Sequence, residues 1–415
     1  MVAFRGLAFS AGVFLVLAFG AVGAEAAQRY ASTTGSGTAC TSAAPCDIVQ
    51  AFNGSGAGDE VIVSPGTYTA TDSLYAPPNG SAHGIAGQPR PVINSSQVNA
   101  LNQNGADLVS DLVINHVGST TAFSVSGPDA VAERLDVVTT GAYACSVTSG
   151  ALLRDSTCVN NKATGVGNRL GVYTATNSTP TTAELRNVTA VATGTGSYAV
   201  QVLAEGSGVT ATIGMRNVIA IGAQADVQAL GAVGGTATAN LAYSAFDSSS
   251  VSGAGTVTPF SAQHNISNPP SFVDAGAGDY HQAEGSPTIN AGSADDKTGS
   301  LDFDGESRVQ GASIDIGADE FPEDTAAPET TIAKGPKKRT TSTKATFKFS
   351  SDDPAATFEC KLDRGGFAPC TSPKKLTHLK KGKRTFSVRA TDASDNADPS
   401  PAVYKWTVKK KPRRH

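Results

Sequence analysis

Short runs in which apolar and polar residues alternate recur between about residues 58 and 250 of this 415-residue chain. Alternation over four to eight residues is typical of half-buried β-strands. A second extended piece follows most of the runs, and turns rich in Gly, Asn, Thr and Ser separate the two. Five of the runs are similar to one another: LVSDLVINHVG (108–118), AERLDVVTTG (132–141), LLRDSTCVNN (152–161), ELRNVTAVATG (184–194) and GMRNVIAIGA (214–223).

No single unit of this repeat is long enough to bury its own apolar face. Stacking the units as coils of a parallel β-helix gives every strand hydrogen-bonding neighbours and buries Leu, Val, Ile and Ala in one continuous core. An antiparallel sandwich or barrel is the alternative, but it gives no reason for a repeated R-[ND]-V-x-A-[VI] register. The lack of long helical patterns excludes an ordinary α/β crossover protein. The prediction is an all-β chain whose main body is a right-handed parallel β-helix (solenoid).

Distinct segments are predicted at the start of the β-helix and after its end. At its start, residues 47–52 predict a short capping helix with Asp47 as N-cap, and residues 60–63 predict a first strand that ends at a Ser-Pro-Gly turn. At its end, the Pro- and acid-rich residues 322–330 predict a linker. Alternating runs after the linker predict a small antiparallel β-sandwich over 331–408, followed by a basic tail over 409–415. The β-helix with its cap therefore spans 27–321.

The N-terminal segment, positions 1–26, sets the compartment. Arg5 precedes an apolar run, and Ala24-Glu25-Ala26 supplies the small-x-small pattern that a signal peptidase cleaves. A membrane anchor helix is the alternative, but a cleavage-type exit follows the apolar run at once. No later stretch is long and apolar enough to span a bilayer. We therefore expect a secreted, extracellular or cell-surface protein with no transmembrane segment after signal cleavage.

Charge divides the chain in two. Residues 325–415 hold 21 Lys and Arg against 8 Asp and Glu, a net charge of +13, whereas residues 28–324 hold 10 against 27, a net charge of −17. A basic module favours anionic partners, so we expect a polysaccharide or an anionic cell-wall polymer, or else the acidic β-helix itself. A generally solubilising surface is the alternative. Nucleic acid is not expected for an exported protein.

The six cysteines fall into three local pairs. Cys40 with Cys46 and Cys360 with Cys370 close short loops and predict disulfides, as expected in an oxidising compartment. For Cys145 and Cys158, the sequence does not decide between a disulfide and two buried free thiols. Proximity alone supports these pairings, because six cysteines permit 15 of them.

Arginine recurs in the repeat at positions 134, 154, 186 and 216, with spacings of 20, 32 and 30. If Arg134, Arg154, Arg186 and Arg216 share one coil position, they form a ladder about 4.8 Å apart that could bind carboxylates or sulfates of an acidic glycan. Nearby acidic residues offer a second interpretation, a solvated and internally balanced outer face.

Two further sets of residues are candidates for chemistry. Asp302-x-Asp304-Gly305 is similar to the start of a calcium loop, although no EF-hand glutamate follows, and a turn that locks the end of the solenoid is the alternative. The six histidines show no metal spacing, and no complete set of catalytic residues is present. We therefore expect no required cofactor, with Ca²⁺ at Asp302 and Asp304 as the one candidate ion.

Two parts of the chain resemble known families. GDEVIVSPGTYT (58–69) resembles the first coil of bacterial right-handed β-helix proteins, and residues 268–321 resemble the segment that defines the choice-of-anchor Q family, through Pro270-x-Phe272, Asp279-Tyr280, Gly285-Ser286-Pro287, Ala291-Gly292, Asp302-x-Asp304-Gly305-x-x-Arg308 and Asp315-Ile316-Gly317-Ala318-x-Glu320-Phe321. The sandwich resembles bacterial Ig-like or fibronectin-like domains, through ATFECKLD…APCTSP and TFSVRATDASDN.

The choice-of-anchor Q resemblance implies an extracytoplasmic β-helix that precedes a surface anchor, and it brings no established reaction. The chain departs from anchored members in lacking a Leu-Pro-x-Thr-Gly sorting signal. We therefore expect a structural or adhesive scaffold that binds polysaccharide. The alternative is a polysaccharide lyase, hydrolase or epimerase that acts on an acidic glycan in the solenoid groove; in β-helix lyases an Arg or Lys often removes the proton beside the uronate carboxylate.

Overall fold

The computed structural model describes residues 26–105, 108–163, 169–258, 262–322, 324, 326–392, 394 and 396–410. It divides into two compact units, Met1–Phe321 and Pro322–His415, which are described separately. The predicted signal peptide lies almost entirely outside the described residues, as does the end of the basic tail. Among the described residues, no helix is long and apolar enough to cross a membrane.

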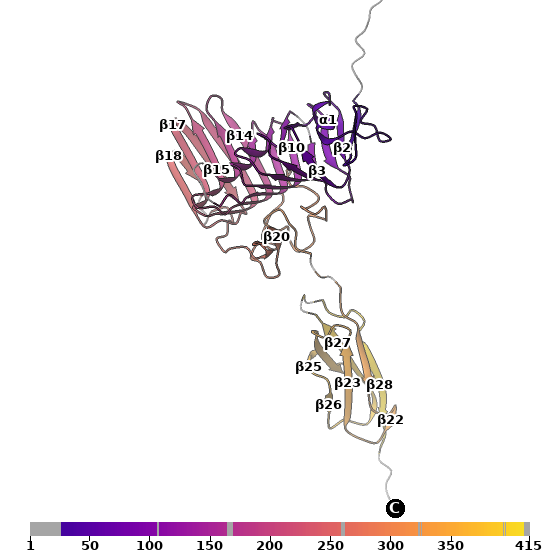
Figure 1. The fold of residues 1–415 in the computed structure, drawn as a ribbon. Coiled ribbons are helices and arrows are strands. Elements are labelled where there is room, and N and C mark those ends of the chain that lie inside the picture. Colours follow the sequence, from indigo (N-terminus) through magenta and orange to yellow (C-terminus); the bar gives the residue numbers. More distant parts are fainter. Residues whose placement is uncertain are drawn as a thin grey trace, which may run out of the picture. The chain divides into compact units, whose positions relative to one another are not determined.

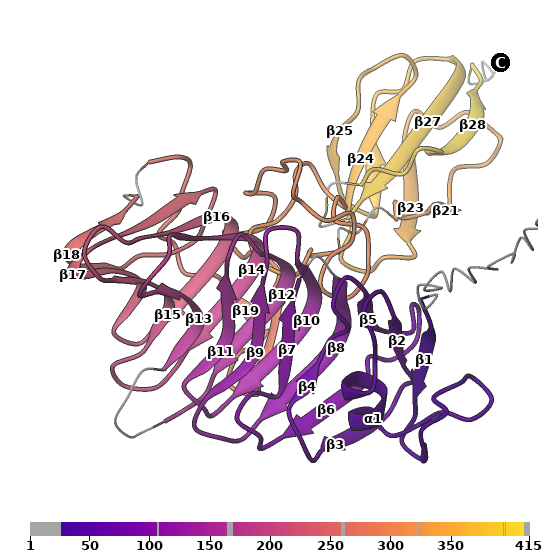
Figure 2. The ribbon, with the colours of Figure 1, turned by 90° about the horizontal axis from the view of Figure 1, so that it is seen from above.

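The first unit is a parallel β-helix. Its strands stack one coil on the next, as Figures 1 and 2 show, and they join one parallel sheet. These strands are β1 (Gln28–Ala31), β2 (Glu60–Val63), β3 (Thr67–Ala70), β4 (Leu74–Tyr75), β5 (Ser81–Gly84), β6 (Val92–Ser95), β7 (Leu101–Asn104), β8 (Leu108–His116), β9 (Thr121–Ser126), β10 (Val131–Thr139), β11 (Tyr143–Thr148), β12 (Leu152–Asn160), β13 (Leu170–Thr176), β14 (Thr181–Ala192), β15 (Tyr198–Glu205), β16 (Thr210–Gly222), β17 (Ala225–Ala242) and β18 (Ser249–Val257).

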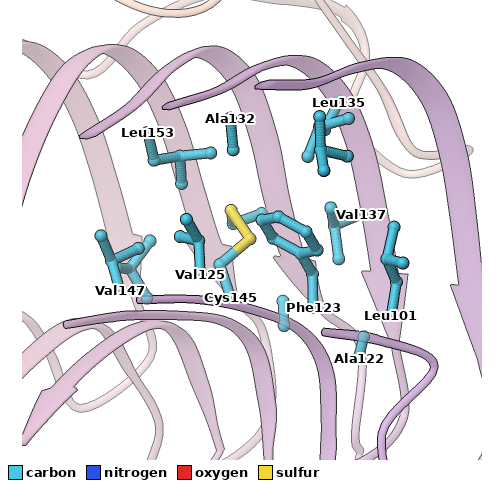
Figure 3. Close-up of a cluster of buried hydrophobic side chains, with 14 of the residues drawn as sticks. Leu101, Ala122, Phe123, Val125, Ala132, Leu135, Val137, Cys145, Val147 and Leu153 are labelled. Carbon is cyan, nitrogen blue, oxygen red and sulfur yellow. A yellow bond between two sulfur atoms is a disulfide. The ribbon is translucent and has the colours of Figure 1, made fainter. Parts of the chain in front are cut away.

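The register explains why the repeat must stack. Residues that point inward pair with inward residues of the next coil, and the resulting interior ladder is buried throughout: Val109, Ala132, Leu153, Leu185, Met215 and Leu241. In Figure 3, Phe123 and Val125 of one wall face Ala132, Leu135 and Val137 of the other. The predicted fold class, a right-handed parallel β-helix followed by a sandwich, is confirmed.

The N-terminal end of the solenoid is closed as expected. Helix α1 (Ile48–Asn53) begins after Asp47, whose carboxylate accepts the Gln50 amide at 2.9 Å, and its Phe52 is buried. The Cys40–Cys46 disulfide lies just upstream. Capping matters here because an open coil would expose unpaired strand groups and apolar core to water.

Six successive coils have a residue with left-handed backbone at one corner, with φ between 49° and 59°: Asp111, Arg134, Asp155, Asn187, Asn217 and Tyr243. The strand pairing of β8, β10, β12, β14 and β16 is interrupted at this corner. Asn and Asp tolerate this conformation better than most residues. Their side chains also connect coils, because Asn187 donates to Asp155 at 2.8 Å and Asn217 donates to Asn187 at 2.9 Å.

An apolar stripe runs along the outside of the β-helix. Val138, Val159, Val191 and Ile221 share one register and point outward from β10, β12, β14 and β16. After the last coil the chain returns along the β-helix through β19 (Phe272–Asp274) and β20 (Asp279–Gln282), the latter labelled in Figure 1. Phe272, Tyr280 and Ile316 of this segment pack against the stripe. We call residues 266–321 the cover segment, because they bury a surface that water would otherwise meet.

The second unit is a β-sandwich. One sheet holds β21 (Thr330–Lys334), β23 (Ala345–Ser351) and β26 (Lys374–Leu376); the other holds β22 (Arg339–Thr340), β28 (Ala402–Val408), β27 (Gly382–Thr391), β24 (Thr357–Leu362) and β25 (Ala368–Cys370). Pairing is antiparallel except between β22 and β28. Phe347 stacks on Phe386 with ring centroids 4.1 Å apart, and Trp406 packs beside them.

All three cysteine pairs are disulfides, with S–S distances of 2.00 Å for Cys40–Cys46, 1.94 Å for Cys145–Cys158 and 1.99 Å for Cys360–Cys370. The pair that the sequence left open, Cys145 and Cys158, joins β11 to β12 inside the solenoid, where both residues are fully buried. Cys360–Cys370 links the paired strands β24 and β25.

Candidate functional site

Three of the four predicted arginines share a register. Arg154, Arg186 and Arg216 pair directly across β12, β14 and β16. The residue that pairs with Arg154 on the preceding coil is Glu133, not Arg134. The prediction of a four-arginine ladder is therefore wrong at Arg134. The sequence spacing of 20 is one residue short of this coil, whose length is 21, and Arg134 occupies the left-handed corner instead.

The guanidinium groups of Arg134 and Arg154 are paired with carboxylates of the β-helix. Arg134 makes a two-pronged contact with Asp111, at 2.7 and 2.9 Å, and also pairs with Glu133. Arg154 donates to Glu133 at 2.7 Å and to the Lys297 carbonyl oxygen at 3.2 Å. These bonds engage the guanidinium N–H donors with groups of the protein itself. Asp111 has a lowered pKa because the bonds from Arg134 outweigh its burial.

The cover segment completes this face farther along the solenoid. Arg186 is held by Glu184 at 3.0 Å and by Asp295 of the cover segment at 2.8 Å, and Lys297 of the cover segment pairs with Glu184 at 3.0 Å. Charges of the β-helix and of the cover segment thus alternate across their boundary. Much of the predicted arginine surface therefore holds two parts of one unit together.

Arg216 is the exception. Its ion pair, to Asp295, is 3.5 Å long, and its guanidinium lies 5.0 Å from the ring centre of Tyr243. It lines a hollow of about 350 Å³ with Arg186, Asn240, Thr258 and Gln263. Within the described residues, this is the part of the arginine face that retains guanidinium donors for an outside anion. Ligand binding by the four arginines stays a prediction, and its best-placed residue is Arg216.

The two predicted calcium ligands face different partners. Asp302 is buried and accepts the amides of Asp304 and Glu306, at 3.0 and 2.8 Å, so it holds its own turn. Asp304 instead meets His281 at 2.8 Å and Arg90 at 3.5 Å. The turn-locking alternative therefore describes Asp302, while calcium binding stays a prediction.

The ligand atoms that could meet around a metal ion belong to His281, Asp304 and Asp319, and they lie within 4.8 Å of one another. Sequence spacing did not reveal this set, because its members come from separate turns of the cover segment. A histidine nitrogen is not the all-oxygen environment that calcium prefers. His281 also bridges Asp304 and Asp279, and these carboxylates raise its pKa to about 10, which makes it an imidazolium that links two parts of the cover segment.

Arg308 of the cover segment is a buried charge, with 1% of its surface exposed. Its Nε lies 3.3 Å from Asp155 Oδ1 of the β-helix corner and its Nη1 lies 3.6 Å from Glu320, while its Nη2 donates to the Gly317 carbonyl oxygen. Burial raises the pKa of Asp155 to about 6 and that of Glu320 to about 8. Both carboxyls therefore take up a proton at a higher pH than an exposed Asp or Glu.

A different surface gathers positive charge without neutralising it. At one end of the sandwich, a hollow of about 730 Å³ is lined by Thr340, Thr341, Ser342, Thr343, Lys344, Leu379, Lys381, Val408, Lys409 and Lys410. The four lysines are exposed, and none of these lining residues carries a carboxylate. We call this surface the lysine hollow.

Backbone hydrogen bonds hold the three walls of the lysine hollow together. Lys409 donates its amide to Thr340 at 2.7 Å, and Leu379 donates its amide to Thr343 at 2.9 Å. Ammonium groups beside several hydroxyls are suited to phosphate, sulfate or carboxylate groups of a polymer. The basic runs in the sequence indicated such partners, but not that these residues meet.

No protein-family model matches the chain, and no curated protein matches it. Among solved structures, the crystal structure of pectate lyase Pel9A is similar, with 12% sequence identity and a TM-score of 0.35 over 71% of this chain and 96% of that chain. A likeness this distant carries no functional argument. The resemblances to the choice-of-anchor Q family and to Ig-like domains stay predictions from the residues.

Proposed function

We propose that the chain is an exported scaffold protein that attaches to anionic polymers through the lysine hollow and presents its β-helix as an elongated binding face. The observation that carries this proposal is the convergence of Lys344, Lys381, Lys409 and Lys410 on one hollow whose lining holds no carboxylate. Exposed cations without internal partners remain available to an outside anion.

The charge division supports the same assignment. The β-helix part of the chain carries a net charge of −17, so an anionic polymer is repelled from it as a whole, whereas residues 325–415 carry +13. Three disulfides agree with an oxidising extracytoplasmic compartment, and the signal-type N-terminal segment supplies the export route. The basic unit is thus the attachment module of the proposal.

Salt-dependent retention tests the proposal. Full-length mature protein should be retained on immobilised polyphosphate and polygalacturonate, and pass through uncharged dextran. Retention should fall steeply between about 0.01 M and about 1 M salt, because the screening length shrinks from about 30 Å to about 3 Å. Equal retention on dextran, or retention that ignores salt, would contradict electrostatic attachment.

The same incubations address the enzymatic alternative. After incubation with the protein, polygalacturonate should show no new reducing ends and no unsaturated, ultraviolet-absorbing products. Either product, formed by wild-type protein and lost in a variant of the Arg216 hollow, would favour the lyase or hydrolase over the scaffold.

A further inference from the structure

A second cavity lies in the β-helix unit, far in sequence from the lysine hollow. It has a volume of about 520 Å³ and opens where the last coils meet the cover segment. One wall comes from the outer face of the strands, including Val191 and Ile221, and the other comes from residues 267–276 and Tyr280. A cavity of several hundred Å³ with an apolar lining and a few polar groups is typical of small-ligand sites.

Part of the cavity lining is apolar and aromatic. Phe272 and Tyr280 meet edge to face, with ring centroids 5.3 Å apart and planes at 85°. Pro269, Pro270 and Ile221 add to this apolar lining. Phe272 is only half-buried, so part of its ring remains open to a ligand.

Another part of the lining is polar and acidic. Asp226 is buried and fixed, because it accepts the amides of Gly222 at 2.8 Å, Asp247 at 2.8 Å and Ser248 at 3.0 Å. The exposed side chain of Asp247 bonds to Asp226, which contributes, after burial, to the raised pKa of Asp226. Asn268 and Ser267 add further hydrogen-bonding groups, and no lining residue among those described is basic.

We infer that this cavity binds a neutral sugar residue of a glycan. A pyranose ring has apolar C–H faces that pack on aromatic and proline rings, and hydroxyl groups at its edge that donate to carboxylates. The cavity lining offers both kinds of surface. An acidic sugar is disfavoured because both charged groups are carboxyls, in a unit that is itself acidic. The site is independent of the lysine hollow, so each can fail without the other.

The test is binding of neutral hexaoses of glucose, mannose, galactose and xylose to full-length protein, measured by titration calorimetry, with oligogalacturonate as the acidic comparison. At least one neutral hexaose should bind, and oligogalacturonate should not bind at this site. Ala275→Trp, which fills the cavity from an exposed position, and Phe272→Ala should each weaken binding by about tenfold or more, as expected for a central aromatic contact.

Val273→Ala is the matched control, because Val273 adjoins Phe272, is 60% exposed and does not line the cavity. It should bind as wild type does. Asp247→Asn, at an exposed position, guards against loss of fold and should weaken binding while the melting temperature stays unchanged. The inference is overturned if no neutral hexaose binds, if Ala275→Trp binds as wild type does, or if oligogalacturonate competes for the cavity.

Discussion

Arg308 locks the cover segment to the β-helix, and its removal should show how much that lock contributes. Arg308→Met keeps an unbranched apolar stem and removes the guanidinium, whose Nε faces Asp155 at 3.3 Å. Both groups are at most 1% exposed, so the variant leaves Asp155 buried with only the more distant Arg154, at 3.8 Å, as a cation. Breaking a buried ion pair in this way costs about 3–5 kcal/mol. The first unit should melt on the order of 10 °C lower.

The assay can separate the two units within one chain. Far-UV circular dichroism follows the whole protein, whereas Trp406, the one tryptophan, is buried in the sandwich and reports the second unit. Arg308→Met should shift the major dichroism transition and leave the tryptophan transition in place. Limited proteolysis should cleave the variant first in the cover segment, residues 266–321.

A second substitution isolates the cause. Adding Asp155→Asn removes the buried carboxylate that Arg308 faced, so the double variant should recover part of the stability that Arg308→Met loses. The reasoning is refuted if Arg308→Met lies within about 1 kcal/mol of wild type, or if the double variant loses the full sum of the two single losses.

Three further outcomes are expected. Burial raises the pKa of Glu320 to about 8 from an ordinary 4.5. Its contribution to the stability of the first unit is therefore full below about pH 4.5 and declines up to about pH 8, by at most about 1.4 kcal/mol per pH unit. Chemical unfolding should show a flatter pH dependence for Glu320→Gln than for wild type, and an unchanged slope would contradict this. Replacing Cys145 and Cys158 by Ala should cost about 3 kcal/mol, and mass spectrometry of the non-reduced chain should find neither thiol free. Arg154→Ala, which breaks the contact with Glu133, should lower the stability of the first unit, whereas Arg216→Ala, whose ion pair to Asp295 is 3.5 Å long, should leave it close to wild type; equal losses of stability would refute the difference.

The sequence was most informative where one local pattern repeats. Alternation and recurrence sufficed for the β-helix, because each strand contacts the same position of the next coil. The one-residue error at Arg134 has the same origin. The spacing of 20 was visible, but the coil length of 21 depends on which residue turns the left-handed corner, and four corner positions are Asp or Asn while this one is Arg.

The repeat pattern could not predict contacts between distant parts of the chain. Asp155 lies in a middle coil and Arg308 in the cover segment, and the three walls of the lysine hollow come from separate turns. One usable signal was present, however. Val138, Val159, Val191 and Ile221 recur on the side of their strands that faces away from the core, and an apolar stripe outside a solenoid indicates that something covers it.

The central claim, attachment through the lysine hollow, is tested most directly by two variants of equal charge. One replaces Lys344, Lys381, Lys409 and Lys410 by Gln; the other replaces the exposed lysines Lys334, Lys348, Lys375 and Lys405, which do not line the hollow. Affinity of full-length protein for immobilised polyphosphate, at about 0.01 M salt where the screening length is about 30 Å, is the measurement. The affinity of the hollow variant should fall about tenfold or more, because each of the four exposed ion pairs with the polymer contributes about 0.2–1 kcal/mol. The affinity of the control variant should fall clearly less. Equal losses in both variants would show that net charge alone attracts the polymer, and would contradict a defined site.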